Sequence, residues 1–392
     1  MKGLKRNMTM NNKQNGAVSL FVVVFTTLLI TIITIGFVSL MIKDQQDASA
    51  TDLSQSAYDS AQSGVEDAKR AIARYRDICN SGGDCSAAAD EINSQTCNAA
   101  VEKLSDVKAS NNEVAIQANG TSNTLNQAYT CTKINLNTND YLGKLSTNES
   151  NIIPLTGESA FDTIQVEWFD SNNLDSTNGF NIDLQKTTST ELPLLPQISW
   201  KPNTPAILQT QLMQVSSNGF KLSDFDNTNA SSQSNANTLF LYPVGNTGTA
   251  NSTIDEREFV NRDIRKTAVG SPLPISCSGS LISGGYACSA KLKLPVPING
   301  GDRSAYLRLS ALYNSSNYRI TLLNGTVPVK FSGVQPEIDS TGRASDLFRR
   351  VVSRVVMFDA NFAYPDVMVT GNVCKNFVVT ADTKDYKNGC NP

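Results

Sequence analysis

The sequence predicts an α+β protein. An N-terminal transmembrane helix continues into a long amphipathic helix, which packs on a disulfide-stapled, mainly antiparallel β-rich exterior region. Three observations predict this. Ala17–Ile42 contains no charged residue, the apolar residues that follow recur at helical spacing, and later segments alternate between apolar and polar residues. We therefore divide the chain into a basic leader (1–16), a transmembrane helix (17–42), an amphipathic helix (43–78), an α+β region (79–195) and a β-rich C-terminal region (196–392).

Composition excludes several classes of enzyme. The chain has 392 residues and no histidine. Catalysis by Ser-His-Asp or Cys-His, zinc bound by histidine and haem on a proximal histidine are all excluded. The net charge is −3, with 36 acidic against 33 basic residues, and four of the basic residues lie in the leader. An acidic exterior repels phosphates, so we expect no nucleic-acid partner.

The segment 17–42 is long enough to cross a membrane. As a helix it extends about 39 Å at 1.5 Å per residue, and the bilayer hydrocarbon core is about 30 Å thick. Hydroxyl residues within it can bond back to carbonyls of their own helix. A buried core helix is the alternative, and uncharged runs of this length argue against it. No other stretch is long and apolar enough, so we expect a single-pass protein.

The charges at the two ends of this segment predict its orientation. Residues 1–16 contain four basic residues and no acid; they are Lys2, Lys5, Arg6 and Lys13. After Ile42, Lys43 is followed by Asp44, Asp47, Asp52 and Asp59. The positive-inside rule then places the N-terminus in the cytoplasm and the region after Ile42 outside. A cleaved secretory signal is the alternative, with Ala48-Ser49-Ala50 as its cleavage site, but the apolar run is far longer than the usual 7–15 residues.

The N-terminal region resembles a known family. The basic leader ends in Gly16, Ala17 opens the apolar run, and a later stretch reads AYDSAQSGVEDA at 57–68. Over about residues 13–75 this is similar to type IV pilins and pseudopilins, most closely to PilX-type minor pilins. The resemblance implies cleavage by prepilin peptidase between Gly16 and Ala17, assembly with other pilin subunits through the N-terminal helix, and a surface filament as the location. Residues 79–195 would then be a pilin-like α+β region.

One position departs from the family. Major pilins carry Glu at the fifth position after the cleavage site, where it pairs with a neighbour's terminal amine, and here that position is Phe21. This implies a minor or tip-proximal subunit with an adhesive or interaction role. Two alternatives stay open. One is a single-pass membrane-anchored adhesin or binding protein that does not polymerise. The other, with less support, is a membrane-tethered enzyme that uses a carboxylate pair or a Ser-Lys dyad.

Two helices are expected at the start of the exterior region. An Ala-rich apolar stripe at spacings of three and four predicts a helix that ends near Ile78, and Gly64 within it suggests a close contact. A second helix is expected across Ala87–Val107, with Ile92, Val101 and Leu104 as its apolar positions. The stripe is made of Leu53, Ala57, Ala61, Val65, Ala68, Ile72 and Tyr75.

Strands are expected after about residue 111. Residues 163–168 alternate, and residues 305–323 consist of two alternating runs around the polar stretch NSSN, which predicts a hairpin. Residues 347–358 fit both helix and strand, and we expect a helical first turn that leads into a strand. Val373–Thr380 is a further expected strand. The proline-rich segment 193–205 is a candidate boundary between two β-rich lobes.

All eight cysteines follow the apolar run, and none forms a C-x-x-C motif. In an exterior compartment this favours four disulfides over a zinc site. Cys277–Cys288 and Cys374–Cys390 are the local pairs. Cys79, Cys85, Cys97 and Cys131 allow three pairings, of which we favour 79–85 with 97–131. The loop closed by Cys374 and Cys390 resembles the disulfide-bounded C-terminal loop of pilins.

Other motifs yield no site. The acidic and amide residues 224–229 lack the glycine and the distal Glu of a calcium loop, so they indicate a solvated loop. P-loop and G-x-G-x-x-G sequences are absent. Arg343, Arg349, Arg350 and Arg354 could contact phosphates, and the simpler interpretation is a sheet face with salt bridges. We therefore expect no catalytic, cofactor-binding or metal-binding residues, no cofactor and no enzymatic activity.

Overall fold

The computed structural model describes residues 15–116, 126–175, 181–186, 195–216, 236–245, 255–258, 272–281, 285–299 and 303–357, together with residues 177 and 179. Two compact units are present. Unit 1 comprises residues 1–133 and 338–353, and unit 2 comprises residues 134–337 and 354–392. The expected boundary near residue 195 does not divide these units, because residues on both sides of it share one hydrophobic core in unit 2.

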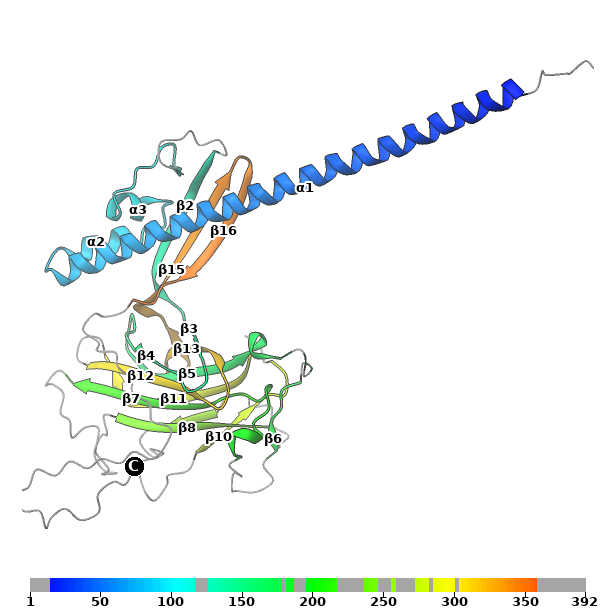
Figure 1. The fold of residues 1–392 in the computed structure, drawn as a ribbon. Coiled ribbons are helices and arrows are strands. Elements are labelled where there is room, and N and C mark those ends of the chain that lie inside the picture. The colour runs from blue at the N-terminus through cyan, green and yellow to red at the C-terminus, as the bar shows by residue number, and fades with distance from the viewer. Residues whose placement is uncertain are drawn as a thin grey trace, which may run out of the picture. The chain divides into compact units, whose positions relative to one another are not determined.

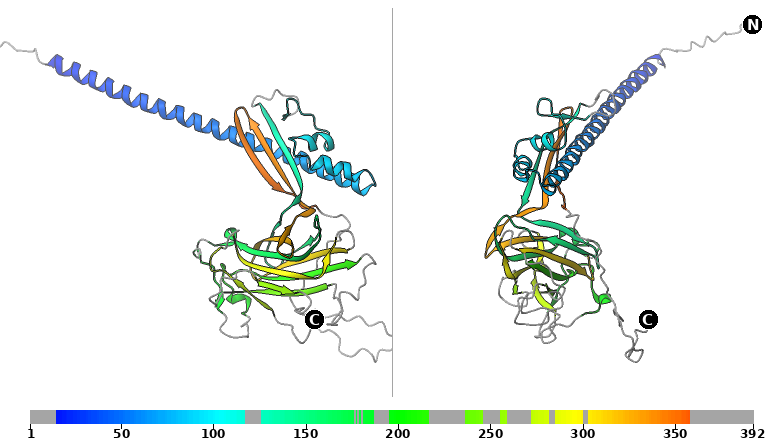
Figure 2. Two further views of the ribbon diagram at one scale, coloured as in Figure 1. Left: turned by 180° about the vertical axis from the view of Figure 1, so that it is seen from behind. Right: turned by 90° about the vertical axis from the view of Figure 1, so that its left-hand side faces the viewer.

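Unit 1 contains one helix of 66 residues, α1 (Asn15–Asn80), which is long and apolar enough to span a membrane. At 1.5 Å per residue it extends about 99 Å. Its C-terminal half runs along a four-stranded sheet with the order β1-β2-β15-β16, as the two views of Figure 2 also show. These strands are β1 (Val114–Ala115), β2 (Gln127–Thr138), β15 (Phe331–Ala344) and β16 (Leu347–Arg354).

The expected helix across Ala87–Val107 is two short helices, α2 (Cys85–Ile92) and α3 (Ala99–Leu104). The break lies at Asn98, whose φ of 64° is left-handed. The Asn98 side chain accepts a hydrogen bond from the Thr132 amide and donates to the Thr130 carbonyl, so strand β2 holds the break in place. The expected apolar positions Ile92, Val101 and Leu104 are buried.

Strand β16 corrects the expectation of a helical first turn at residue 347. The segment is extended from Leu347, directly after a two-residue turn from β15 in which Ser345 has a φ of 50°. The segment pairs with β15, and the valines of β16 suit an extended backbone. Tertiary pairing therefore overrides the helical spacing of the apolar residues.

Unit 2 contains a twelve-stranded, mainly antiparallel sheet (Figure 1). Its main path runs β14-β13-β5-β11-β10-β8-β7-β12-β4, and β3, β6 and β9 pair off this path. The strands are β3 (Tyr141–Leu145), β4 (Ser150–Pro154), β5 (Phe161–Asp170), β6 (Gln185–Lys186), β7 (Ile207–Ser216), β8 (Ala236–Gly245), β9 (Asp255–Glu258), β10 (Leu273–Cys277), β11 (Tyr286–Ile298), β12 (Arg303–Leu312), β13 (Ser316–Asn324) and β14 (Val327–Val329).

The expected hairpin at 305–323 is wrong. Both strands exist as β12 and β13, but β12 pairs with β4 and β7, whereas β13 pairs with β3, β5 and β14. In a flat sheet with this order they would lie about 29 Å apart. The connection 313–315 reaches only about 14 Å. The sheet must therefore curve over on itself, and its inner face encloses the core.

Strand β5 shows how the sequence builds this core. Ile164, Val166 and Trp168, which the alternating pattern places on one face, are each 0% exposed. The Trp168 indole Nε1 donates a 3.0 Å hydrogen bond to the Ala206 carbonyl, so its one polar atom is satisfied. The expected strand Val373–Thr380 lies outside the described residues.

Candidate functional site

The N-terminal half of α1 exposes apolar side chains on all sides. Its large hydrophobic residues between Leu20 and Ile42 are 47% to 73% exposed. The hydroxyls of four threonines donate to carbonyls of the preceding turn; they are Thr26, Thr27, Thr31 and Thr34. These bonds satisfy the hydroxyls within the helix, so the surface offered to its surroundings is apolar. Such a surface suits lipid or other apolar helices.

The expected processing site lies at the beginning of this helix. Gly16 and Ala17 fall in the first turn of α1, which begins at Asn15. Phe21, at the position of the missing Glu, is 73% exposed. Cleavage between Gly16 and Ala17 stays a prediction.

The C-terminal half of α1 buries one stripe of small residues. Ala57, Ala61, Val65 and Ala68 are each 0% exposed. A Cβ at Gly342 of β15 would lie 2.1 Å from the Ala61 backbone nitrogen. The backbones of α1 and β15 therefore meet without an intervening side chain, and only glycine fits at position 342.

A polar contact lies within the same stripe. Asp67 is 7% exposed, and its carboxylate accepts a 2.7 Å hydrogen bond from the Tyr129 hydroxyl of β2. Arg70, one turn further along α1, pairs with the other carboxylate oxygen. Burial raises the pKa of the Tyr129 hydroxyl above its ordinary value. This pair was not predicted from the sequence, although an acid three residues after Gly64 and four before Ala71, next to the apolar stripe, was a detectable signal.

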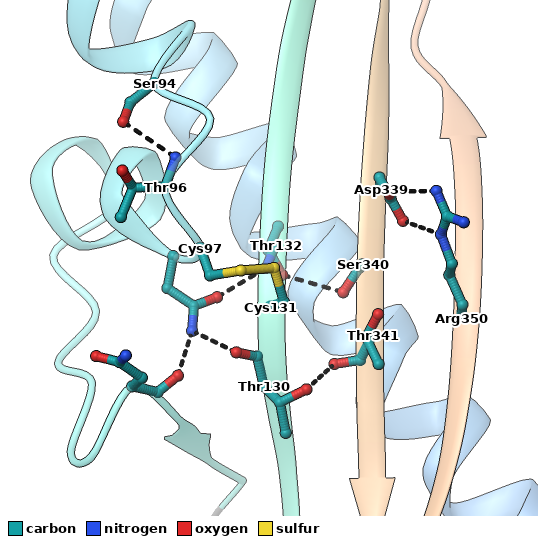
Figure 3. The surroundings of a disulfide bond; sticks show 12 residues. Ser94, Thr96, Cys97, Thr130, Cys131, Thr132, Asp339, Ser340, Thr341 and Arg350 are labelled. Carbon is teal, nitrogen blue, oxygen red and sulfur yellow. Dashed lines mark hydrogen bonds and ion pairs between the residues drawn. A yellow bond between two sulfur atoms is a disulfide. The ribbon is translucent and has the colours of Figure 1, made fainter.

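Figure 3 shows the disulfide that joins α3 to the sheet. Cys97, two residues before α3 begins, is bonded to Cys131 of β2. Asn98, the residue after Cys97, donates through Nδ2 to the carbonyls of Asn112 and Thr130. The covalent bond and the amide contacts thus secure the same short segment to β2.

Two further disulfides match the favoured pairing. Cys79–Cys85 closes the turn after α1, and Cys277–Cys288 joins directly opposed residues of β10 and β11. The three pairings expected for these six cysteines are therefore confirmed. Cys374 and Cys390, and with them the fourth expected pair, lie outside the described residues, as does the segment 224–229.

The four arginines of the basic cluster all have partners. Arg343 contacts Glu113 at 2.6 Å, Arg350 contacts Asp339 at 2.6 Å, and Arg354 contacts Glu337 at 2.8 Å. Arg349 Nε donates to the Ser54 hydroxyl at 2.8 Å. The hydrogen bonds that Arg343 donates to the Glu113 carboxylate raise the pKa of Arg343. All four arginines are therefore engaged in contacts within the protein, as the interpretation of a sheet face with salt bridges predicts.

Titratable residues elsewhere also form structural pairs. Glu167 of β5 and Arg319 of β13 lie directly opposite each other and form a 2.7 Å ion pair. Arg319 also lies over the Tyr286 ring, 5.0 Å from its centroid. Within the described part of the chain, no three His, Cys, Asp or Glu side chains are grouped so that they could hold a metal ion.

Neither a protein-family model, nor a curated protein, nor a solved structure matches the chain.

Proposed function

We propose that this chain is a minor pilin-like structural subunit of a type IV pilus or a related secretion filament. In this proposal residues 17–42 first hold the subunit in the membrane, with the N-terminus cytoplasmic. They then pack against other pilin subunits, and the region after Ile42 is displayed outside as an interaction surface. The carrying observation is that α1 is one continuous helix with an apolar, exposed N-terminal half and a C-terminal half that contacts its own sheet.

In this proposal the two halves of α1 have different roles and need different surfaces. The half around Leu20–Ile42 needs an apolar surface on all sides, since it moves between lipid and neighbouring helices. The half around Ala57–Ala68 needs small side chains, since it must lie close to β15. Both requirements are met within one helix, and the leader ending in Gly16 supplies the processing site that the family resemblance implies.

Phe21 favours a minor subunit within this proposal. A repeating subunit needs a carboxylate near its N-terminus to neutralise the terminal amine of its neighbour in an apolar environment, where an unpaired charge costs several kcal/mol. Phenylalanine cannot supply this charge. A subunit used once or a few times in a filament avoids the requirement.

Phe21 also supports the second candidate, a single-pass membrane-anchored adhesin that does not polymerise. Such a protein needs the apolar span and the flanking charges but neither cleavage nor helix packing. The basic leader and the aspartates after Ile42 provide its orientation.

Mass spectrometry of the mature N-terminus separates the two candidates. The chain is expressed with a prepilin peptidase, and membrane and sheared-surface fractions are compared. We expect a protein that begins at Ala17, carries a methylated amine and enters the sheared fraction. Gly16→Leu should block cleavage, whereas Gly3→Leu, a matched change within the leader, should not. An intact chain beginning at Met1 in both fractions would contradict filament assembly and leave the membrane-anchored adhesin.

A further inference from the structure

Strand β16 forms one edge of the four-stranded sheet of unit 1. Among the described residues it pairs with β15 on one side, and no strand lies on its other side. In Figure 3 it is the outermost strand, the one that carries Arg350. An edge strand presents backbone N–H and C=O groups that a further strand can bind, so proteins normally cover or blunt such edges. With eight residues, β16 is long enough to accept another strand.

The backbone groups that point outward belong to alternate residues. Just beyond β16, the Val355 amide donates to a β15 carbonyl at 3.0 Å. Successive residues of a strand direct their backbone groups to opposite sides, so Arg349 and Val351, in phase with Val355, also bond to β15. The amides of Phe348 and Val352 then point away from the sheet. They are the donors that an added strand would use.

Two devices that commonly blunt an edge do not operate here. β16 contains no proline. Its two exposed arginines are drawn away from the edge: Arg350 reaches back to Asp339 of β15 through two 2.6 Å bonds, and Arg349 bonds to a hydroxyl of α1. Neither side chain therefore lies across the backbone groups of the edge.

The opposite edge of the same sheet is closed. β1 pairs with residues 128–129 of β2. Further along β2, the Asn98 side chain accepts from the Thr132 amide and donates to the Thr130 carbonyl, and the Asn98 amide donates to the Thr132 carbonyl. The chain thus provides partners for these backbone groups of β2, and β16 is the edge open to another chain.

The direction of β16 argues against a second copy of this chain as the partner. Gly342 and Ser340 of β15 face Ala61 and Gly64 of α1 respectively, so β15 runs against α1 and β16 runs along it. A symmetric antiparallel pair of β16 strands would make the two α1 helices point in opposite directions. Two α1 helices that span one membrane in the same orientation cannot do so. The occupant is therefore a segment of another protein.

A lipid surface does not fit this edge either. Arg349 contacts Ser54, which lies about 18 Å beyond Ile42 along α1. The headgroup region adds only roughly 5–8 Å to each side of the hydrocarbon core. The edge consequently lies beyond the reach of the headgroups when residues 17–42 span the membrane.

The side chains of β16 indicate the chemistry of the partner. Phe348 and Val352 are 54% and 53% exposed and lie on the face away from α1. Arg349, on the α1 face, is exposed and has a neutral hydroxyl as its partner. An added strand would place apolar side chains beside the first two and a carboxylate beside the third. We propose that the open edge of β16 binds an extended segment of a partner protein in which apolar residues alternate with polar and acidic ones.

The test uses the full chain in detergent and a synthetic ten-residue peptide in which valine alternates with glutamate and threonine. Hydrogen exchange of single backbone amides is followed by NMR. Without peptide, the amides of Phe348 and Val352 should exchange fast, and those of Arg349 and Val351 slowly. The peptide should slow the first two at least about tenfold, with saturation below about 1 mM, and leave the other two unchanged.

Variants of the chain sharpen the result. Val352→Pro removes one outward N–H and leaves the bonds to β15 in place, because proline is tolerated where an edge strand faces solvent. It should abolish peptide binding. Val352→Thr, the matched control, keeps the N–H and a β-branched side chain, and should bind within about threefold of the unaltered chain. If Val352→Pro does not fold, exchange in the unaltered chain still decides the question.

Variants of the peptide test its pattern and its charge. A peptide with proline at two positions cannot pair with the edge and should give no protection. A peptide with lysine in place of glutamate should bind about threefold more weakly than the acidic one. Arg349→Glu should reverse this preference.

Four results would overturn the proposal. They are slow exchange at Phe348 and Val352 without peptide, no slowing by about 5 mM peptide, equal protection by the proline peptide, or unchanged binding by Val352→Pro. Slow exchange that is lost on dilution would identify a second copy as the occupant instead. The proposal does not rest on filament assembly, so a negative result leaves the proposed function standing, and an uncleaved N-terminus leaves the edge site standing.

Discussion

The Tyr129 hydroxyl donates a 2.7 Å hydrogen bond to the Asp67 carboxylate and so ties strand β2 to helix α1 across 62 positions of sequence. Both side chains are buried, at 1% and 7% exposed. Because the acceptor is charged, this bond is stronger than one between neutral groups. It also fixes the rotation of α1 about its own axis, since Asp67 and the buried alanines lie on the same side of the helix.

Removing this hydroxyl should destabilise unit 1. Tyr129→Phe leaves a buried carboxylate with Arg70 as its remaining ionic partner, and hydrogen bonds to charged groups contribute about 1.5–3 kcal/mol. We expect the free energy of unfolding to fall by about 2 kcal/mol, measured by urea denaturation of the full chain in detergent. Tyr58→Phe is the matched control, because Tyr58 lies on α1 and is 46% exposed. It should change stability by less than about 0.5 kcal/mol. Equal effects of the two changes would contradict a role for the bond.

The same tyrosine should make stability depend on pH in the alkaline range. Burial raises the pKa of folded Tyr129 above 10, whereas the unfolded chain loses this proton near pH 10. Between those two values only the folded state holds the proton, so stability is complete below pH 10 and falls as the pH rises beyond it. The slope is at most about 1.4 kcal/mol per pH unit for one proton.

Unfolding measurements at pH 9 and pH 11 test this expectation. Tyr129→Phe should lose less stability over this interval than the unaltered chain. Part of the slope will remain, since burial also raises the pKa of Tyr242 and Tyr286. Identical slopes for the variant and the unaltered chain would show that Tyr129 is not the group responsible.

The contact between α1 and β15 should not tolerate a methyl group. In Gly342→Ala the new Cβ would lie 2.1 Å from Ala61 N and 2.2 Å from Ala57 O, and neither backbone atom can move independently. We expect a loss of at least about 3 kcal/mol, the upper end of overpacking effects. Gly64→Ala should cost less, since its nearest atom is the Ser340 hydroxyl, a side-chain group.

Gly279→Ala is the control for both changes, because nothing lies within 4 Å of its new Cβ. Thermal unfolding of the three variants should rank them Gly342→Ala, Gly64→Ala and Gly279→Ala, from the least to the most stable. A Gly342→Ala protein as stable as the Gly279→Ala protein would mean that α1 and β15 are not in close contact.

The three disulfides should differ in what they contribute. In the chain-entropy model, the closed loops predict about 4 kcal/mol for Cys97–Cys131. The shorter loops predict about 3 kcal/mol for Cys277–Cys288 and about 2 kcal/mol for Cys79–Cys85. Double replacement by alanine, followed by urea denaturation, measures each. The order would be contradicted if loss of Cys79–Cys85, with a sequence separation of 6, cost more than loss of Cys97–Cys131, with a separation of 34.

Residue spacing along the chain correctly predicted the features that depend on neighbouring residues. The stripe from Ala57 to Ile72 is buried, and Cys277 and Cys288 are bonded across neighbouring strands. Each follows from spacing along the chain. The hairpin at 305–323 failed because three residues joining two alternating runs fit a hairpin and equally fit a crossing between distant strands. Only the pairing of β12 with β7, far away in sequence, distinguishes the two.

The same limit applies to the candidate sites, because contacts between residues far apart in the chain cannot be predicted from residue spacing. The apolar run that begins at Ala17 is visible in sequence, since one helix makes it. The contact of Asp67 with Tyr129 and the aromatic contact of Trp200 with Tyr313 are not visible, because their members come from segments separated by tens of residues. Asn203 and Asn314 look like ordinary loop residues in the sequence. Their importance depends on which carbonyls the fold brings within reach of their amides.

The ion pair between Glu167 and Arg319 should contribute more than ion pairs on the surface. Its side chains are 9% and 25% exposed, and Arg319 also contacts the Tyr286 ring. Arg319→Met keeps much of the apolar stem and removes the charge, which leaves Glu167 without its ionic partner in a buried position. We expect a loss of about 3 kcal/mol, because an uncompensated buried charge is costly.

Lys69→Met, which breaks the exposed pair with Glu66, is the control and should cost less than about 1 kcal/mol. Raising the salt concentration should weaken the surface pair and leave the buried pair nearly unchanged. If the two changes had equal effects, the Glu167–Arg319 pair would be as solvated as the surface pair, which would contradict its burial.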